Sequence, residues 1–160
     1  ERGGRGEVGG QSPEEMIKFL ILVNKQGQTR LARYYEDRSG MSAEERSTQE
    51  ADIVRKCLMR GEQQCSFLEF MGHKVIYRRY ASLFFIVGVD DDENEIGVLE
   101  FIHCLVETLD KHFENVCELD IMSQLEKAHF VVDEMLINGF IVETNKTNIL
   151  EPIRFLDKAT

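Results

Sequence analysis

Three oxygen-bearing side chains between residues 90 and 94 are spaced like the ligands of a calcium ion. Asp90, Asp92 and Asn94 match the first, third and fifth positions of a calcium-binding loop. That loop also needs Gly at its sixth position and a bidentate Glu at its twelfth, which here are Glu95 and Phe101. An acidic loop leading into a helix N-terminus, where negative charge is favourable, explains the segment better.

A second candidate for chemistry is the run of ionisable residues from Glu100 to Glu107. Glu100 and His103 have the spacing of half a di-iron site in a helical bundle. His103 also precedes Cys104, which suggests a base beside a thiol nucleophile. Neighbouring residues on a helix point about 100° apart, so these two side chains cannot act as a dyad. With Glu107 one turn later, the run is better explained as a solvated helix face.

The four cysteines, Cys57, Cys65, Cys104 and Cys117, show no Cys-x-x-Cys spacing, so the sequence predicts no zinc site. With no secretory signal ahead of them, we expect reduced, buried thiols in a cytosolic chain. Neither a Walker loop nor a Gly-x-Ser-x-Gly motif is present. We therefore expect a protein that has no cofactor and is not an enzyme.

The overall charge and the length of the apolar runs exclude two further classes. A formal net charge of -10 argues against nucleic acid as the main partner, because neutralising phosphates needs a clustered basic surface. The longest apolar run, Leu83 to Val89, is far shorter than the roughly 18 residues that a transmembrane helix needs. Any association with a membrane is therefore expected to come through partners.

The elements that position these side chains begin with a predicted hairpin. Its first arm, residues 17–24, is apolar on both faces, and its second arm carries Arg30 and Arg33. Residues 82–89 are a second apolar run. A strand that is apolar on both faces must be covered on both faces, so these two runs are predicted to lie at the centre of one sheet. Two half-buried strands are expected within residues 64–70 and 74–80.

Helix signals follow each group of strands. The capping-box pattern from Ser42 to Glu45 predicts a first helix that starts near Ser42 and stops at Gly61. The main apolar stripe of the second helix runs from Ile96 to Phe113, and Val98, Phe101 and Leu105 form a further stripe beside it. These stripes and the one on the third helix are wide, so we expect some of them to bind a partner. The later helices are predicted from Asn94 as far as Phe113, from Ile121 to a C-cap at Asn138-Gly139, and around Ile149 to Leu156, with a kink at Pro152.

This order of elements, β-β-α-β-β-β-α-α-α, predicts an α+β fold. The short connections favour antiparallel pairing, with helices on both faces of the sheet. The predicted core consists of Phe19, Ile21, Val23, Leu83, Phe85, Val87, Ile102, Val106 and Leu125.

Residues 1–15 are predicted to be a disordered leader, ahead of a domain that spans residues 16–160. The leader is rich in Gly and Glu, and Val8 is its one large apolar residue. It contains Gly4-x-Gly6-x-x-Gly9, but a dinucleotide fingerprint needs a strand before it and a helix after it. We expect the leader to contribute nothing to the fold.

Several blocks of this domain resemble the small sigma subunits of the heterotetrameric clathrin-adaptor complex family. They are MIKFLILVNKQGQTRLARYY, YRRYASLFFIVGVD, LEFIHCLVETLDKHFENVCELDIM and VDEMLINGFIVET. Within the family, NKQGQTRL, QQCSFLE and VETNKTNIL most resemble the branch of adaptor complex four, in a plant-like form. The resemblance runs from Met16 to the C-terminus.

The resemblance implies a fold, a function and a set of partners. The fold is longin-like: a five-stranded antiparallel sheet with one helix on one face and two on the other, here with a short C-terminal helix. The partners are two large adaptor subunits and one medium subunit, with no nucleic acid. The expected role is cargo sorting in vesicle-mediated transport, on the cytosolic face of the trans-Golgi network and of vesicles.

The resemblance also implies a site for acidic dileucine signals in cargo tails. Arg30 falls where the family places the basic residue that meets the acidic end of the signal. The leucine pocket would be lined by Ala81, Leu83, Phe85, Val106, Asn115, Val116 and Ile121. The other explanation is that the apolar members are simply core and that Arg30 is a solvated edge residue.

Two other classes of protein remain as alternatives to an adaptor subunit. One is another longin-domain trafficking protein, such as a SNARE longin domain or a tethering-complex subunit. A SNARE would add a heptad-repeat segment and a membrane anchor after the domain. The second is an enzyme, for which the chain offers no convergent set of nucleophile, base and metal ligands.

Overall fold

The computed structural model describes residues 17–36, 38–60, 67–90, 93–114 and 116–159. Its centre is a five-stranded sheet in the order β2-β1-β5-β4-β3, in which every neighbouring pair is antiparallel. The predicted α+β class and antiparallel sheet are therefore confirmed. The strands are β1 (Ile17–Asn24), β2 (Thr29–Tyr34), β3 (Phe67–Phe70), β4 (His73–Tyr80) and β5 (Leu83–Asp90).

The two apolar strands β1 and β5 lie side by side at the centre of the sheet. They pair from Ile17 opposite Val89 to Asn24 opposite Leu83. Every residue of β5 except Asp90 is buried. Since successive side chains point to opposite faces, burial along the whole strand means that both faces are covered. The prediction of two central strands is confirmed, with the second shifted by one residue.

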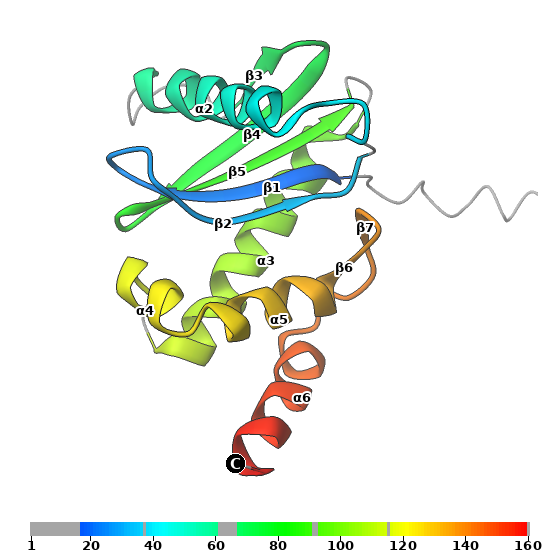
Figure 1. The fold of residues 1–160 in the computed structure, drawn as a ribbon. Helices are drawn as coiled ribbons and strands as arrows, with labels where there is room; N and C mark the ends of the chain where they lie inside the picture. Colours follow the sequence, from blue (N-terminus) through cyan, green and yellow to red (C-terminus); the bar gives the residue numbers. More distant parts are fainter. Residues whose placement is uncertain (1–16, 37, 61–66, 91–92, 115, 160) are drawn as a thin grey trace, which may run out of the picture.

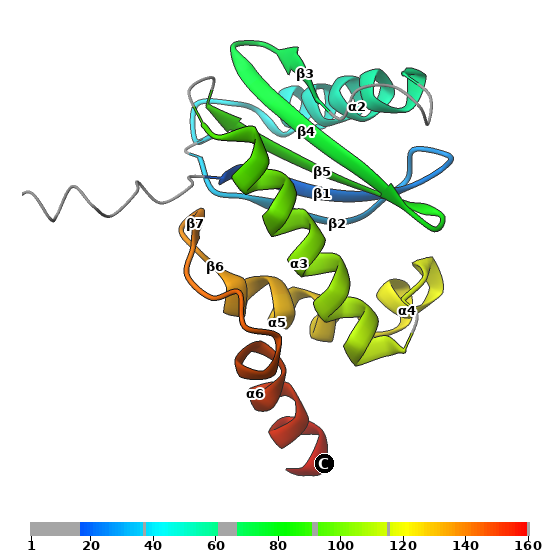
Figure 2. The ribbon, with the colours of Figure 1, turned by 180° about the vertical axis from the view of Figure 1, so that it is seen from behind.

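Helices cover the two faces unequally (Figures 1 and 2). Helix α2 (Ala43–Met59) lies on one face, and α3 (Glu95–Phe113) and α5 (Leu125–Met135) lie on the other. The sheet therefore separates two apolar clusters. The smaller one joins Ile21 and Ile86 to Ile53 of α2, and the larger one joins Phe85 to the buried residues of α3 and α5.

Local capping interactions fix where the long helices begin. The Ser42 hydroxyl accepts a hydrogen bond from the Glu45 amide (3.1 Å), and the Glu45 carboxylate accepts one from the Ser42 amide (2.8 Å). This reciprocal pair is the predicted capping box. At the start of α3, the Asn94 side chain accepts from the Ile96 amide at 3.0 Å. The prediction of a helix start near Ser42 and another at Asn94 is confirmed.

The predicted third helix is in fact two helices followed by a small hairpin. Helix α4 (Glu118–Ser123) ends at Gln124, whose φ of -131° and ψ of 51° are not helical, and α5 follows. Strands β6 (Leu136–Ile137) and β7 (Phe140–Ile141) pair across Asn138 and Gly139. Both turn residues have positive φ, 52° and 90°, as a tight hairpin turn requires. The prediction of a C-cap at Asn138-Gly139 was wrong.

Two predictions about burial were also wrong. Leu125, predicted as core, is 39% exposed because it is the first residue of α5, while the other predicted core residues are buried. Val98, Phe101 and Leu105 are at most 2% exposed within this chain, so they are not available to a partner. Ile96, taken as part of the core stripe, is 67% exposed. The buried face of α3 is therefore wider than predicted, and it begins after Ile96.

The last helix, α6 (Lys146–Ala159), begins earlier than predicted. The Asn145 side chain accepts from the Asn148 amide at 3.1 Å, and the helix continues past Pro152. None of the helices in the described ranges is long and apolar enough to cross a membrane. The leader, the predicted stop at Gly61 and residues 64–66 lie outside the described residues.

The close pairing of β1 with β5 predicts that Gly88 cannot be enlarged. Gly88 lies opposite Phe19, and an added Cβ would overlap the Phe19 ring, which is only 2% exposed and cannot move into solvent. We expect Gly88→Ala to lower the free energy of unfolding by about 1–3 kcal/mol. Denaturant unfolding measures this. Gly40→Ala is the matched control, because nothing lies within 4 Å of an added Cβ there; equal stability of the two variants would contradict the prediction.

Candidate functional site

Five of the apolar residues predicted to line a leucine pocket meet in the larger apolar cluster. Leu83 and Phe85 come from β5, Val106 from α3, Val116 from the connection before α4, and Ile121 from α4. None of the five is more than 8% exposed. The structure therefore brings these residues together, but in contact as core. Two leucine side chains could reach these residues only if the elements that bury them moved.

The other two predicted lining residues are placed differently. Ala81 lies in the turn between β4 and β5, with a φ of 56°, and is exposed. It is near Leu83 along the chain but is not part of the apolar cluster. Asn115 lies outside the described residues. The apolar half of the candidate site is thus built by Leu83, Phe85 and three residues from the second half of the chain.

Arg30 contacts the same short helix that carries Ile121. It lies on edge strand β2, and its side chain is 23% exposed. Its Nε donates to Oε2 of Glu118 at 2.7 Å, and its Nη2 donates to Oε1 of Gln28 at 3.0 Å. Glu118 is the first residue of α4. Arg30 is therefore not a free solvated residue, because an ion pair ties it to α4.

Glu118 has a second partner, which the sequence did not reveal. Asn24, at the end of β1 and 3% exposed, donates from Nδ2 to the same Glu118 oxygen at 2.8 Å. The Asn24 side-chain oxygen accepts from the amides of Gln26 and Gln28, which fixes the turn between β1 and β2. The hydrogen bond from Asn24, and next the one from Arg30, lower the pKa of Glu118. The carboxylate is therefore ionised at neutral pH.

Asp110 fixes the connection between α3 and α4. Its Oδ1 accepts from the amide of Val116 at 2.8 Å, two residues after the left-handed residue Glu114 at the end of α3. A hydrogen bond between the Tyr80 hydroxyl and Asp110 raises the pKa of Tyr80. Asp110 thus links the end of β4 to the connection that delivers Val116 to the apolar cluster.

Arg33, the second arginine of β2, also contacts the second half of the chain. Its Nη2 donates to both carboxylate oxygens of Asp133 on α5, at 2.5 and 2.6 Å. The two arginines of β2 therefore bind α4 and α5 respectively. This charge-assisted contact, made by one guanidinium nitrogen, holds α5 close to β2.

Several of the other residues considered for chemistry have structural partners. Asn94 caps α3, Asp90 lies 3.6 Å from Lys18, and Asp92 lies outside the described residues. On α3, Glu107 bonds His103 at 3.0 Å and, through its other oxygen, Lys146 at 2.9 Å.

A second Glu-x-x-His pair, Glu126 and His129 on α5, has the same spacing as Glu100 and His103. With this pair the chain has two Glu-x-x-His motifs, the number that such a di-iron site needs. Even so, among the described residues no group of three or more His, Cys, Asp or Glu could hold a metal ion.

Of the three cysteines in the described residues, Cys57 alone is fully buried as predicted. Cys57 is buried, and burial raises the pKa of its thiol to about 12. Cys104 is half-buried, with its Sγ 3.1 Å from the carbonyl oxygen of Thr144. Cys117 is exposed, so the prediction was wrong for this residue. Each of these three is a free thiol, and Cys65 lies outside the described residues.

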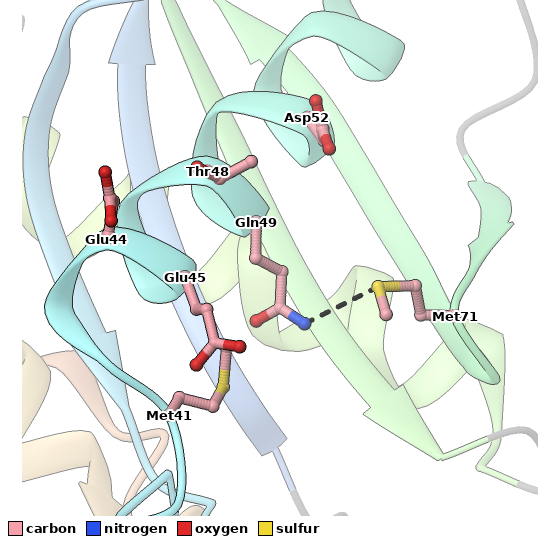
Figure 3. Close-up of a pocket in the computed structure, with 7 residues that line it drawn as sticks. All are labelled: Met41, Glu44, Glu45, Thr48, Gln49, Asp52 and Met71. Carbon is pink, nitrogen blue, oxygen red and sulfur yellow. Dashed lines mark hydrogen bonds between the residues drawn. The ribbon is translucent and has the colours of Figure 1, made fainter.

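A cavity of about 480 Å³ lies on α2 and the β3–β4 turn, away from the predicted site (Figure 3). Carboxylates and two methionines surround it, and the Gln49 amide lies 3.6 Å from the sulfur of Met71 across it. None of the predicted pocket residues lines this cavity, which is bounded by Met41, Glu44, Glu45, Thr48, Gln49, Asp52 and Met71.

Relatives of known identity match nearly the whole domain. An AP-4 complex subunit sigma of Arabidopsis thaliana is 66% identical over 89% of this chain and 98% of its own length. The human AP-4 complex subunit sigma-1 is 52% identical over 89% of this chain and 97% of its own. An AP-1 complex subunit sigma-2 of Arabidopsis thaliana is 41% identical over 89% of this chain and 86% of its own length. These relatives are adaptor subunits and not enzymes.

The fold and the family model agree with these relatives. A chain of a homology model of the full-length AP-3 complex in a stretched open conformation superimposes with a TM-score of 0.69 at 28% identity, covering 90% of this chain and 95% of that one. The longin-like fold is therefore confirmed. The family model of the clathrin adaptor complex small chain matches residues 16–160. The chain belongs to the clathrin adaptor complex small chain family and is a small subunit of an adaptor complex.

Proposed function

We propose that this chain is the sigma subunit of an AP-4-type heterotetramer that sorts cargo at the trans-Golgi network. The observation that carries the proposal is the gradient of identity, from 66% and 52% with AP-4 sigma chains to 41% with an AP-1 sigma chain. Its partners in this proposal are two large subunits and one medium subunit. The complex, rather than this chain alone, provides peripheral attachment to the cytosolic face of the membrane.

An exposed apolar surface on α4 and α5 supports assembly with a partner. Leu119, Met122 and Leu125 are 69%, 50% and 39% exposed. We call these three residues the α4–α5 patch. Exposed apolar side chains that are close together on a surface are typical of protein interfaces. The patch includes Met122 and Leu125 of the predicted third helix, whereas the stripe of Val98, Phe101 and Leu105 on α3 is buried inside this chain.

Affinity purification of the tagged chain tests the assembly. Mass spectrometry should find two large adaptor subunits and one medium subunit with it. Leu119→Asp should remove most of them without changing the melting temperature, because a charge in the patch would be buried by the partner but is solvated in the free chain. Met59→Asp, at a side chain 77% exposed on α2, is the matched control and should retain them. Recovery of the three subunits with Leu119→Asp would contradict the assigned interface.

We further propose that the Arg30 region binds the acidic dileucine signals of cargo tails. Once the elements that bury it have moved, the apolar cluster offers contacts for two leucines, each contributing roughly 1.5–3 kcal/mol when buried. The guanidinium of Arg30 lies beside α4, which carries Ile121, so one ligand can reach both the charge and the apolar residues. A charge-assisted hydrogen bond from Arg30 would orient the acidic end of the signal.

Peptide titration of the assembled complex tests this site. An acidic dileucine peptide should bind, and the same peptide with both leucines replaced by alanine should not. Arg30→Gln should weaken binding about fivefold, or about 1 kcal/mol, and reduce its salt dependence, because the lost contact is between charges. Arg33→Gln is the matched control: it lies on the same strand but pairs with Asp133, and should bind like the wild type. Equal affinities for the wild type and Arg30→Gln would overturn the role of Arg30.

A further inference from the structure

The basic residue of the proposed signal site already holds a carboxylate of this chain. Nε of Arg30 lies 2.7 Å from Oε2 of Glu118, and the two side chains are only 23% and 25% exposed. A partly buried ion pair is screened less than one on the open surface. In the free chain the guanidinium is therefore neutralised before any acidic ligand arrives.

The Arg30–Glu118 contact is part of a closed hydrogen-bond network and is not a chance surface contact. Nδ2 of Asn24 donates to Oε2 of Glu118 and to Oε1 of Gln28, each at 2.8 Å. Nη2 of Arg30 donates to the same Gln28 oxygen at 3.0 Å. Asn24, Gln28, Arg30 and Glu118 thus hold one another in place, with Asn24 buried at the end of β1.

Glu118 is also linked to the element that closes the apolar cluster. It is the first residue of α4, and Ile121, three residues later on the same helix, is fully buried against the sheet. Residues three apart on a helix lie on the same side, so the Arg30–Glu118 pair and Ile121 hold the same side of α4 down. A ligand that takes Arg30 from Glu118 removes one of the contacts that keep α4 in this position.

We infer that Glu118 is an internal competitor for the acidic end of the signal, so that a dileucine peptide binds by displacing Glu118 from Arg30. This inference rests on the proposed signal site. Glu118 lowers the affinity for acidic signals, because the Arg30–Glu118 ion pair must be broken before Arg30 can pair with the acidic residue of the peptide. A peptide without the acidic residue cannot displace Glu118 and gains nothing from Arg30.

The test is a cycle of one protein change and one peptide change, measured as dissociation constants on the assembled complex. The protein is wild type or Glu118→Gln, and the peptide carries Glu or Gln at the acidic position before the leucines. With the acidic peptide, Glu118→Gln should bind about three- to tenfold tighter than the wild type. The preference for the acidic over the neutral peptide should grow in the variant. Glu126 is an exposed residue on α5, and Glu126→Gln makes the same change in net charge. This control should alter neither the affinity for the acidic peptide nor the preference for it over the neutral peptide.

Each outcome of the cycle bears on a different claim. If the wild type binds and Glu118→Gln binds no tighter, Glu118 does not compete for Arg30, while the proposed signal site stands. If only Glu118→Gln binds, the competitor is supported in its strongest form. If neither binds, the signal site and the competitor both fail. Glu118→Ala is a second variant with the same expectation. Failure of both variants to assemble would also overturn the inference, because a competitor must be removable without loss of the fold.

Discussion

Strand β1 is buried on both faces, and the rest of the molecule is arranged to keep it so. It pairs with β5 on one side and β2 on the other, and both of its faces carry large apolar side chains. One helix layer could cover only half of that surface, so the chain supplies α2 on one side and α3 with α5 on the other (Figure 1). Edge strand β2 then has to join the sheet to helices that come more than 80 residues later in the chain.

That junction is polar, and it is where the candidate function lies. Arg30 and Arg33 extend from β2 to Glu118 and Asp133, so α4 and α5 are attached to the sheet edge by ion pairs as well as by apolar packing. Apolar packing is roughly proportional to buried area and has little directional preference, whereas a guanidinium fixes its partner's position. The Arg30 pair is half-buried, and it lies beside the apolar cluster that the family resemblance assigns to signal binding.

Features set by neighbouring residues could be predicted from the sequence. The two apolar runs, the capping box at Ser42 and the cap at Asn94 depend on residues within a few positions, and the structure confirms them. Asn138-Gly139 was misread because the same dipeptide suits a helix C-cap and a hairpin turn. The hydrogen bond from the Ile17 amide to the Gly139 carbonyl involves β1, far away in the sequence, and no local pattern reveals it.

The candidate site was predictable only in part for the same reason. The family resemblance supplied Arg30 and the apolar residues, but Glu118 stands 88 positions from Arg30 and carries no local signal of their pairing. Nor could the sequence show that the apolar residues pack against one another in the free chain. Leu83, Phe85 and Ile121 belong to one apolar cluster, although Ile121 comes from a helix much later in the chain.

The central claim is that one guanidinium, that of Arg30, is shared between Glu118 and the acidic end of a cargo signal. An experimental structure of the assembled complex, determined with and without an acidic dileucine peptide, tests it most directly. Without the peptide, Arg30 should contact Glu118, as it does here. With the peptide, Arg30 should contact the peptide carboxylate, Glu118 should have moved away, and the two leucines should lie between α4 and β5. A bound peptide elsewhere on the surface, with the Arg30–Glu118 pair intact, would contradict the account.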